Sequence, residues 1–271
     1  TYLCTFNGLK STGKFVYVSC LSPYVILGIF LVRGALLEGS GLGLNFLFIP
    51  TAEKFELVGK GATWRTAAVQ ILFSSGVAYG PFLYYGTARG RGDGLVAPSF
   101  WIPLANSATS IYAAITIFLF LGHVATVLGK TGEDDFKNVA QSGPTLLFVA
   151  FPSMLNFFAG AQFFGVIFFT MAVFLGIDSV FGWVDYYTKM TRDFFPEFDK
   201  KFKHWQQVAG IMVFSFIWSL MFCMDGGIWS FNWYDDYCSS VQLLVCLFSQ
   251  TIFIPYIFGI HKLSEMIYIR T

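Results

Sequence analysis

Charged residues are scarce in this chain, since Asp, Glu, Lys and Arg make up only 12% of its 271 residues. Soluble domains contain about 25%. The formal net charge is only +1, so the sequence gives no reason to expect nucleic acid or a strongly charged partner. Hydrophobic residues reach 55% and aromatic residues 20%, which indicates that the lipid bilayer is the solvent of much of the chain.

Other features are missing as well. The 5 cysteines form no CxxC pair and no ligand spacing, which argues against a zinc site and against a disulfide framework. The N-terminal end has neither an initiator methionine nor a signal-peptide pattern, and an apolar segment begins soon after Thr1. We therefore expect this sequence to be a fragment that starts inside a longer polypeptide.

Six apolar segments are each long enough to cross about 30 Å of hydrocarbon as a helix. They are residues 15–37, 66–88, 100–127, 163–187, 208–224 and 239–260. The sequence thus predicts an all-α integral membrane protein with six transmembrane helices in a single domain covering residues 1–271.

Basic residues predict the orientation of these segments. Lys10 and Lys14 precede the first segment, and Lys200, Lys201 and Lys203 lie between the fourth and fifth. Because positive charge marks the cytoplasmic side, we expect both ends of the chain to be cytoplasmic. The long connection at about 128–161 is then external, and its partly apolar sequence indicates a helical lid that folds back on the bundle.

The second segment contains helix-breaking residues at its centre. Residues 73–81 read FSSGVAYGP. Glycine costs about 1 kcal/mol and proline about 3 kcal/mol inside a helix, whereas proline fits the first turn of a helix. We expect one helix to stop near Ser75, the chain to unwind at mid-membrane, and a second helix to start at about Pro81. A simple proline kink is the alternative, but it does not explain the small and hydroxyl residues before Pro81.

A single carboxylate, Asp178, interrupts the most apolar stretch of the chain, residues 163–184. A charge at this depth costs at least about 2.5–3.5 kcal/mol on insertion scales. A bound cation offsets this cost directly, and Ser179 adds a hydroxyl oxygen of the kind that hard cations prefer. The alternative is a buried acid that is hydrogen-bonded to a neighbouring helix.

Uncharged polar residues form two further pairs. Gln70 and Ser74 are four residues apart, as are Asn106 and Ser110, so each pair shares one helix face. Such amides and hydroxyls can donate hydrogen bonds to chloride and can supply oxygens to sodium. Hydrogen bonding between helices is the commoner role of single pairs, but their coincidence with a broken helix and a buried carboxylate favours an ion site.

Motifs along almost the whole chain occur in the order and at the spacing of one transporter family. They are GLKSTGK at 8–14, Pro23-Tyr24, LVRG at 31–34, residues 64–80, NSATS at 106–110, SGP at 142–144, Phe151-Pro152, residues 163–181 and GGIWSF at 226–231 with Asp235. The sequence resembles the neurotransmitter:sodium symporters, which are built from inverted repeats with broken helices. The resemblance implies a partial inverted-repeat symporter fold, comprising the last helix of repeat one and all of repeat two. The first and third helices of the family have no counterpart in the chain.

The resemblance also implies roles for individual residues. Sodium ligands are Leu175 (through its carbonyl), Asp178 and Ser179 at one site, and Ser74 and Asn106 at another; chloride ligands are Gln70, Ser74, Asn106 and Ser110. The substrate would be bound by Phe73, Ser74, Gly76, Tyr79, Ser179, Val180 and Trp183, while Asp235 and Asp193 match the acids of the external and internal gates. A hydroxyl at Ser110, where chloride-independent relatives carry a carboxylate, suggests dependence on chloride.

Four positions depart from the family pattern. Ser75 stands where the family usually has leucine, and Thr66 where it usually has an acid. Trp183 replaces a small residue, which suggests a small substrate. Residues 87–89 (Thr-Ala-Arg) replace a Ser-Tyr-Asn motif, which puts the usual internal gate in question.

The function implied by the resemblance is secondary active transport. Sodium and chloride would be co-transported with a small amino acid or an amine, without an organic cofactor or nucleic acid. The expected partners are membrane lipid, the small-molecule substrate and the missing N-terminal helices of the same polypeptide. The plasma membrane is the expected location, with an organellar membrane as the alternative.

A rival hypothesis is a transport-inactive family member that serves as a structural or assembly subunit in a membrane complex. Trp183, Ala88 and the missing first helices favour it. An enzyme is not indicated, because His123, His204 and His261 lie near the ends of the apolar segments and no nucleophile motif or pair of catalytic acids is found.

Overall fold

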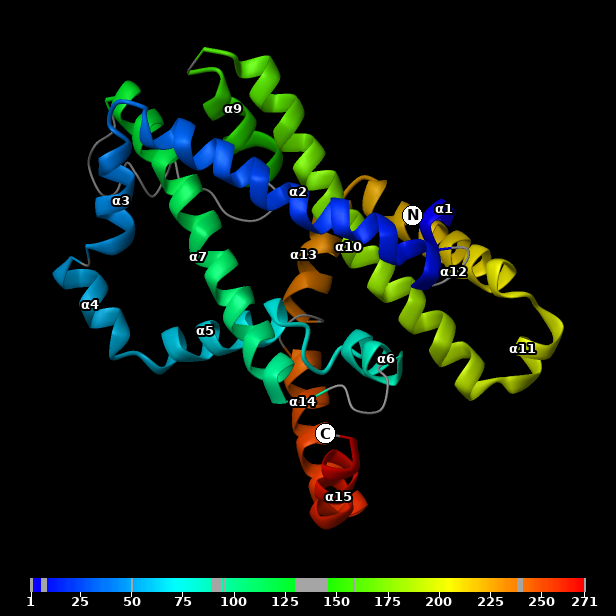
Figure 1. Cartoon of the computed structure of the whole chain (residues 1–271). Coiled ribbons are helices and arrows are strands. Elements are labelled where there is room, and N and C mark those ends of the chain that lie inside the picture. Colours follow the sequence, from blue (N-terminus) through cyan, green and yellow to red (C-terminus); the bar gives the residue numbers. More distant parts are fainter. Residues whose placement is uncertain are drawn as a thin grey trace. The chain divides into compact units, whose positions relative to one another are not determined.

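The computed structural model describes residues 2–5, 9–49, 51–88, 94, 96–129, 146–157, 159–237 and 241–270. Within these residues every regular element is a helix and no strand occurs, which confirms the predicted all-α fold (Figure 1). The α-helices are α1 (Tyr2–Thr5), α2 (Leu9–Ala35), α3 (Ser40–Phe48), α4 (Ala52–Val58), α5 (Gly61–Ser74), α6 (Pro81–Ala88), α7 (Val96–Val127), α9 (Phe151–Leu155), α10 (Ala161–Phe194), α11 (Pro196–Lys201), α12 (His204–Ser219), α13 (Gly227–Asp236), α14 (Gln242–Ile252) and α15 (Ile260–Arg270). Two π-helices, η1 (Leu146–Ala150) and η4 (Phe253–Gly259), and one 3₁₀-helix, η2 (Leu220–Cys223), complete the set.

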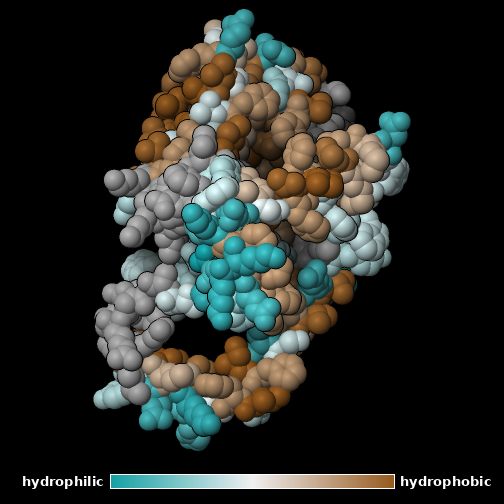
Figure 2. Space-filling model, turned by 90° about the vertical axis from the view of Figure 1, so that its right-hand side faces the viewer, coloured by the Kyte–Doolittle hydropathy of each residue, from teal (hydrophilic) through white to brown (hydrophobic). Residues whose placement is uncertain are grey.

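Five helical stretches in the described part of the chain are long and apolar enough to cross a bilayer. They are Phe15–Ala35, Val96–Val127, Ala161–Phe194, His204–Cys223 and Gln242–Tyr268. A helix of about 20 residues spans the hydrocarbon layer, so each of these is sufficient by length. Hydrophobic side chains also cover much of the face drawn in Figure 2, as expected for a surface in contact with lipid.

The sixth predicted segment, residues 66–88, is divided between two shorter helices. It comprises most of α5 and all of α6, with residues 75–80 between them. The predicted interruption is therefore confirmed. The described residues do not include Arg89 of the divergent motif at 87–89 or residues 142–144. They also leave out residues 130–145, the greater part of the expected external lid.

The chain forms two compact units, which are described separately. Unit 1 consists of residues 1–15, 61–107 and 179–271, and unit 2 of residues 16–60 and 108–178. The long helices α2, α7 and α10 contribute residues to both units.

Phenylalanine rings form the core of unit 2. Phe30 on α2 is buried, and its ring centroid lies 5.7 Å from that of Phe120 on α7 and 5.6 Å from that of Phe151 on α9. Phe168 on α10 completes the group, stacked on Phe151 with centroids 4.1 Å apart. These rings contact one another mainly edge to face, the geometry that aromatic pairs prefer.

Part of the expected lid contributes to this core. Residues 146–155 form η1 and α9, and Phe151, Met154 and Leu155 are buried in the same apolar cluster as Phe30. These residues are therefore helical and packed within unit 2. Their function as a lid stays a prediction.

The helices α3 and α7 approach each other through two glycines. A methyl group added at Gly43 would lie 1.8 Å from the carbonyl oxygen of Phe118, and one added at Gly122 would lie 2.5 Å from the amide nitrogen of Gly43. Only hydrogen atoms fit between these backbones. Small residues at such crossings allow membrane helices to pack closely.

Unit 1 contains the broken helix and the C-terminal helices. Phe181 and Val184 on α10 and Val208 on α12 are buried in it, and the ring of Phe15 meets the edge of Phe181 at 5.8 Å. Within this unit α1 contacts α12, and α14 contacts α5. The contact between α14 and α5 brings the C-terminal part of the chain to the broken helix.

The glycine contact in unit 2 gives a direct test of the packing. We expect Gly43→Ala in the full-length protein to lower the free energy of unfolding by about 1–3 kcal/mol, because the added methyl forces the backbones of α3 and α7 apart. Gly41→Ala on the same helix is the matched control, since nothing lies within 4 Å of its added methyl. Thermal unfolding of the two purified variants measures the difference, and equal melting temperatures would contradict the close crossing.

Candidate functional site

The break between α5 and α6 has the local conformation that its sequence predicts. The helix α5 ends at Ser74 and α6 begins at Pro81, with proline at the position where no amide donor is needed. Between them Gly76, Ala78 and Gly80 have positive φ angles of 68°, 70° and 105°. Residues with positive φ angles cannot continue a right-handed helix, so the chain is unwound over about one turn.

Short local bonds and one distant side chain hold the unwound segment. The amide of Gly76 donates to the carbonyl of Phe73 at 3.0 Å, and the amide of Leu83 donates to that of Gly80 at 2.9 Å. The side-chain amide of Gln250 on α14 donates to the carbonyl oxygen of Ala78 at 3.3 Å. Sequence reasoning did not identify Gln250, although a glutamine inside an apolar segment was the available signal.

Gly80 has two reasons to be glycine. Its φ of 105° is costly for any residue with a side chain. In addition, a methyl group added there would lie 2.3 Å from the ring of Tyr186 on α10. The end of the break that leads into α6 is therefore in direct contact with α10.

Ser74 and Asn106, which were predicted to bind ions together, are hydrogen-bonded to each other. The side-chain amide of Asn106 on α7 donates to the hydroxyl of Ser74 at 2.9 Å, and that hydroxyl donates to the carbonyl of Ile71 at 3.3 Å. The contact joins α7 to the last turn of α5, directly before the break. Gln70 lies one turn earlier on α5, and Ser110 lies one turn later on α7 and belongs to unit 2.

Aromatic side chains line up beside the break. The ring of Tyr79 meets the edges of Phe73 at 5.9 Å and of Trp183 at 5.6 Å, and Trp183 stacks on Tyr187 at 5.7 Å. Three of the predicted substrate contacts, Phe73, Tyr79 and Trp183, are therefore neighbours. Of the others, Gly76 lies in the unwound segment, and Ser179 and Val180 lie on α10, where their side chains are exposed.

Asp178 on α10 is bound by two residues of α2. The hydroxyl of Ser19 donates to one carboxylate oxygen at 2.5 Å, and the thiol of Cys20 donates to the other at 3.3 Å. Ser19 is fully buried, and Asp178 is partly buried. Both donors are neutral, so they stabilise the carboxylate without cancelling its charge. Leu175 lies three residues earlier and Ser179 directly follows on the same helix.

Sequence reasoning missed Ser19 and Cys20. They are 159 and 158 residues away from Asp178 in the chain, and nothing in the sequence links them to it. In the described part of the chain no group of three or more His, Cys, Asp or Glu residues is arranged to hold a metal ion. A set of one carboxylate with hydroxyl and carbonyl oxygens fits a hard monovalent cation better than it fits a transition metal.

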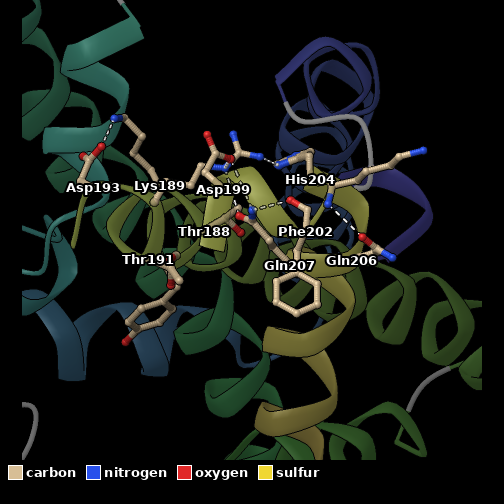
Figure 3. Close-up of polar contacts among 12 residues, drawn as sticks. Thr188, Lys189, Thr191, Asp193, Asp199, Phe202, His204, Gln206 and Gln207 are labelled. Carbon is tan, nitrogen blue, oxygen red and sulfur yellow. Dashed lines mark hydrogen bonds and ion pairs between the residues drawn. The ribbon is translucent and has the colours of Figure 1, made fainter. Parts of the chain in front are cut away.

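The two predicted gate acids lie in different surroundings. Asp193 forms an ion pair with Lys189, one turn earlier on α10, as Figure 3 shows. Asp235 lies near the end of α13 and is exposed. Exposed pairs at this spacing contribute only about 0.3–0.5 kcal/mol, so the pair leaves Asp193 free to exchange partners at little cost.

A polar network connects α10, α11 and α12 (Figure 3). Arg192 forms an ion pair with Asp199 at 3.0 Å, and its guanidinium also contacts Gln207 at 3.0 Å and His204 at 3.0 Å. Gln207, which is buried, donates to the carbonyl of Phe202 at 2.9 Å. The network fixes the reversal of the chain after α10, a region whose basic residues served in the sequence only to predict orientation.

The chain is similar to known proteins over almost its whole length. The family model described as "Sodium:neurotransmitter symporter family" matches residues 1–270. The human "Sodium- and chloride-dependent neutral and basic amino acid transporter B(0+)" is 32% identical over 260 residues, which are 96% of this chain and 40% of that protein.

Two other relatives match this chain over a similar length. The "Sodium-dependent dopamine transporter" of Caenorhabditis elegans is 31% identical over 273 residues, 99% of this chain and 43% of that protein. The "Creatine transporter" of Torpedo marmorata is 32% identical over 260 residues, 95% of this chain and 41% of that protein. The chain therefore spans about two fifths of the length of the curated relatives it matches.

The strained glycine at the break can be tested by substitution. We expect Gly80→Ala in the full-length protein to lower the free energy of unfolding by about 1–3 kcal/mol, because a side chain at this φ is strained and because it meets Tyr186. Gly86→Ala on α6 is the control, since nothing lies within 4 Å of its added methyl.

The double variant Gly80→Ala with Tyr186→Ala separates the two causes. It should recover the part of the lost stability that comes from the clash with the ring. Thermal unfolding that is the same for Gly80→Ala and Gly86→Ala would show that the break is not packed as described.

Proposed function

The chain belongs to the sodium:neurotransmitter symporter family, and we propose that the protein is a secondary active transporter that couples the entry of sodium and chloride to uptake of a small amino acid or an amine. The family consists of transporters rather than enzymes. The protein is an integral membrane protein, and we propose the plasma membrane as its location, with both ends of this chain in the cytoplasm.

The observation that carries this proposal is the hydrogen bond from Asn106 to Ser74 at the end of α5, immediately before the unwound segment. Irregular backbone at membrane depth is tolerated where it is buried in protein or lines a cavity for a solute. In transporters such breaks supply oxygens and helix ends to ions and substrate. Here the break, the amide and the hydroxyl lie together in unit 1, which supports a sodium site formed by Ser74 and Asn106.

We assign the second sodium to Asp178, Ser179 and the carbonyl of Leu175. The carboxylate needs positive charge to offset its burial, and the neutral donors Ser19 and Cys20 do not supply it. In this proposal Ser19 and Cys20 hold the carboxylate when sodium is absent. Sodium binding would then replace at least one of these hydrogen bonds.

Chloride is assigned to Gln70, Ser74, Asn106 and Ser110. These residues carry donors but no charge, which suits an anion that balances the positive charge of sodium nearby. The shared use of Ser74 and Asn106 couples the two ions, since the same two side chains contribute to both sites.

The aromatic group beside the break suggests the size of the substrate. Trp183 contacts both Tyr79 and Tyr187, so it occupies space that a small residue would leave open. Phe73, Ser74, Gly76, Ser179 and Val180 would complete the pocket. The names of the relatives give neutral and basic amino acids, dopamine and creatine, so we propose only a small molecule with an amino or similar cationic group.

We further propose that Asp193 and Asp235 act in the internal and external gates. Asp193 would exchange its partner Lys189 for another cation when the internal side closes. The six spans and the external lid at about 128–161 belong to the same proposal.

The rival function is that of a transport-inactive subunit in a membrane complex. It is favoured by the tryptophan at position 183, which fills part of the proposed pocket. Uptake of a panel of radiolabelled amino acids and amines by cells that express the full-length protein distinguishes the two. Uptake that requires sodium supports transport, whereas no sodium-stimulated uptake of any compound by protein present at the cell surface would favour the subunit.

Removal of the carboxylate tests the sodium assignment. Changes around a metal ligand alone cost about 10–100-fold in metal affinity, so Asp178→Ala should weaken sodium activation of uptake by more than about tenfold. Glu197→Ala is the control, because this exposed acid on α11 lies outside the proposed sites. Unchanged sodium dependence in Asp178→Ala would remove the second sodium site from the proposal.

A fixed negative charge tests the chloride assignment. Ser110→Glu should allow uptake without chloride, because the carboxylate replaces the charge of the anion. Ala108→Glu places the same side chain on another face of α7 and should leave the chloride requirement intact. Uptake by Ser110→Glu that still rises with chloride concentration as in the wild type would count against the site.

A further inference from the structure

Asp185 on α10 is a buried acid to which none of the sites above assigns a role. Its exposed fraction is 2%, and neither of its carboxylate oxygens has a hydrogen-bond partner among the described residues. The large majority of buried polar side-chain atoms in proteins have such a partner. An unpartnered buried carboxyl group therefore calls for an explanation.

The donors that follow Asp185 on the same helix are engaged elsewhere. The hydroxyl of Thr188 donates to the carbonyl of Val184 at 2.7 Å. Lys189 is paired with Asp193, as Figure 3 shows, and Arg192 is bound to Asp199. Both cations of this part of α10 are thus committed to exposed or partly exposed acids rather than to the buried one.

Among the residues that the structure describes, no cation forms an ion pair with Asp185. Phe181 and Val184 on its own helix are buried and apolar. On α6, the phenol of Tyr84 is within electrostatic range of both Asp185 and Arg192. Tyr85 lies next to Tyr84. From α12, His204 contacts the guanidinium of Arg192. The side chains of Tyr84 and Tyr85 are neutral phenols, and the ring of His204 is directed to Arg192.

A bare carboxylate in such surroundings has lost its water without gaining a partner, which strongly favours the neutral form. A metal ion could also neutralise it, but a hard cation needs several oxygen ligands, and neither oxygen of Asp185 has a polar partner in the described part of the chain. A proton needs only the carboxylate itself. We propose that Asp185 is a proton-binding site, occupied while this part of α10 is packed as in the structure.

The contrast with Asp178 supports this assignment. Asp178, seven residues earlier on α10, accepts hydrogen bonds from Ser19 and Cys20 on its two oxygens. Asp185 accepts no such bond from any residue that the structure describes. One helix therefore presents one carboxyl group suited to a metal cation and another suited to a proton.

Proton binding at Asp185 links pH to conformation. A state that buries Asp185 binds the proton more tightly than a state that exposes it to water, so rising pH favours exposure. Because one group is involved, the equilibrium changes by at most about tenfold per pH unit.

Infrared spectroscopy of the purified full-length protein in lipid bilayers tests the proposal directly. As the pH is lowered from neutral to about 5, the wild type should gain the carbonyl stretch of a protonated carboxylic acid, and Asp185→Asn should lack that band. Asp185→Glu, which keeps the acid, should retain the band at a shifted frequency. Asp193→Asn is the matched control and should leave the band unchanged, because Asp193 is exposed and paired with Lys189.

A second measurement covers the case in which a variant alters the fold. In thermal unfolding, the stability of the wild type relative to Asp185→Asn should fall as pH rises, by at most about tenfold in the unfolding constant per pH unit. Identical infrared spectra of the wild type and Asp185→Asn down to about pH 5, or a stability difference independent of pH, would overturn the proposal. Neither readout requires transport, so both are independent of the proposed function.

Discussion

Asp178 imposes the main physical constraint on this molecule, because a carboxylate within an apolar helix must have its charge offset. The structure directs Ser19 and Cys20 to its two oxygens, yet both are neutral donors. Neutral hydrogen bonds reduce the cost of burial, while a cation removes the charge itself. Unit 1 separately contains an unwound segment and an amide–hydroxyl pair, which is consistent with a protein that binds ions rather than one that only spans the bilayer.

Contacts with other helices determine the conformation of the unwound segment. Gly76, Ala78 and Gly80 have positive φ angles, and each such residue is sparsely populated in isolation. Gln250 from α14 occupies a carbonyl that the break releases, and Tyr186 from α10 leaves no room for a side chain at Gly80. The segment is thus held from two other helices, both of which a change of state would have to move.

How much the sequence predicted depends on the range of the interaction. Glycine and proline chemistry is local, so the end of α5 near Ser75 and the start of α6 at Pro81 were predicted correctly. Apolar length predicted the all-α fold in the same way. Ser19, Gln250 and the isolation of Asp185 were not predicted, because they depend on contacts between distant parts of the chain or on the absence of such contacts.

The account rests on the replacement of the hydrogen bonds at Asp178 by a cation. A pair of experimental structures of the full-length protein, one with sodium and one with choline in its place, measures this most directly. We predict density for an ion between the carboxylate of Asp178 and the carbonyl of Leu175 in sodium only, with the bond to Ser19 or to Cys20 lost. The same bonds to Ser19 and Cys20 in both structures, without ion density, would contradict the account.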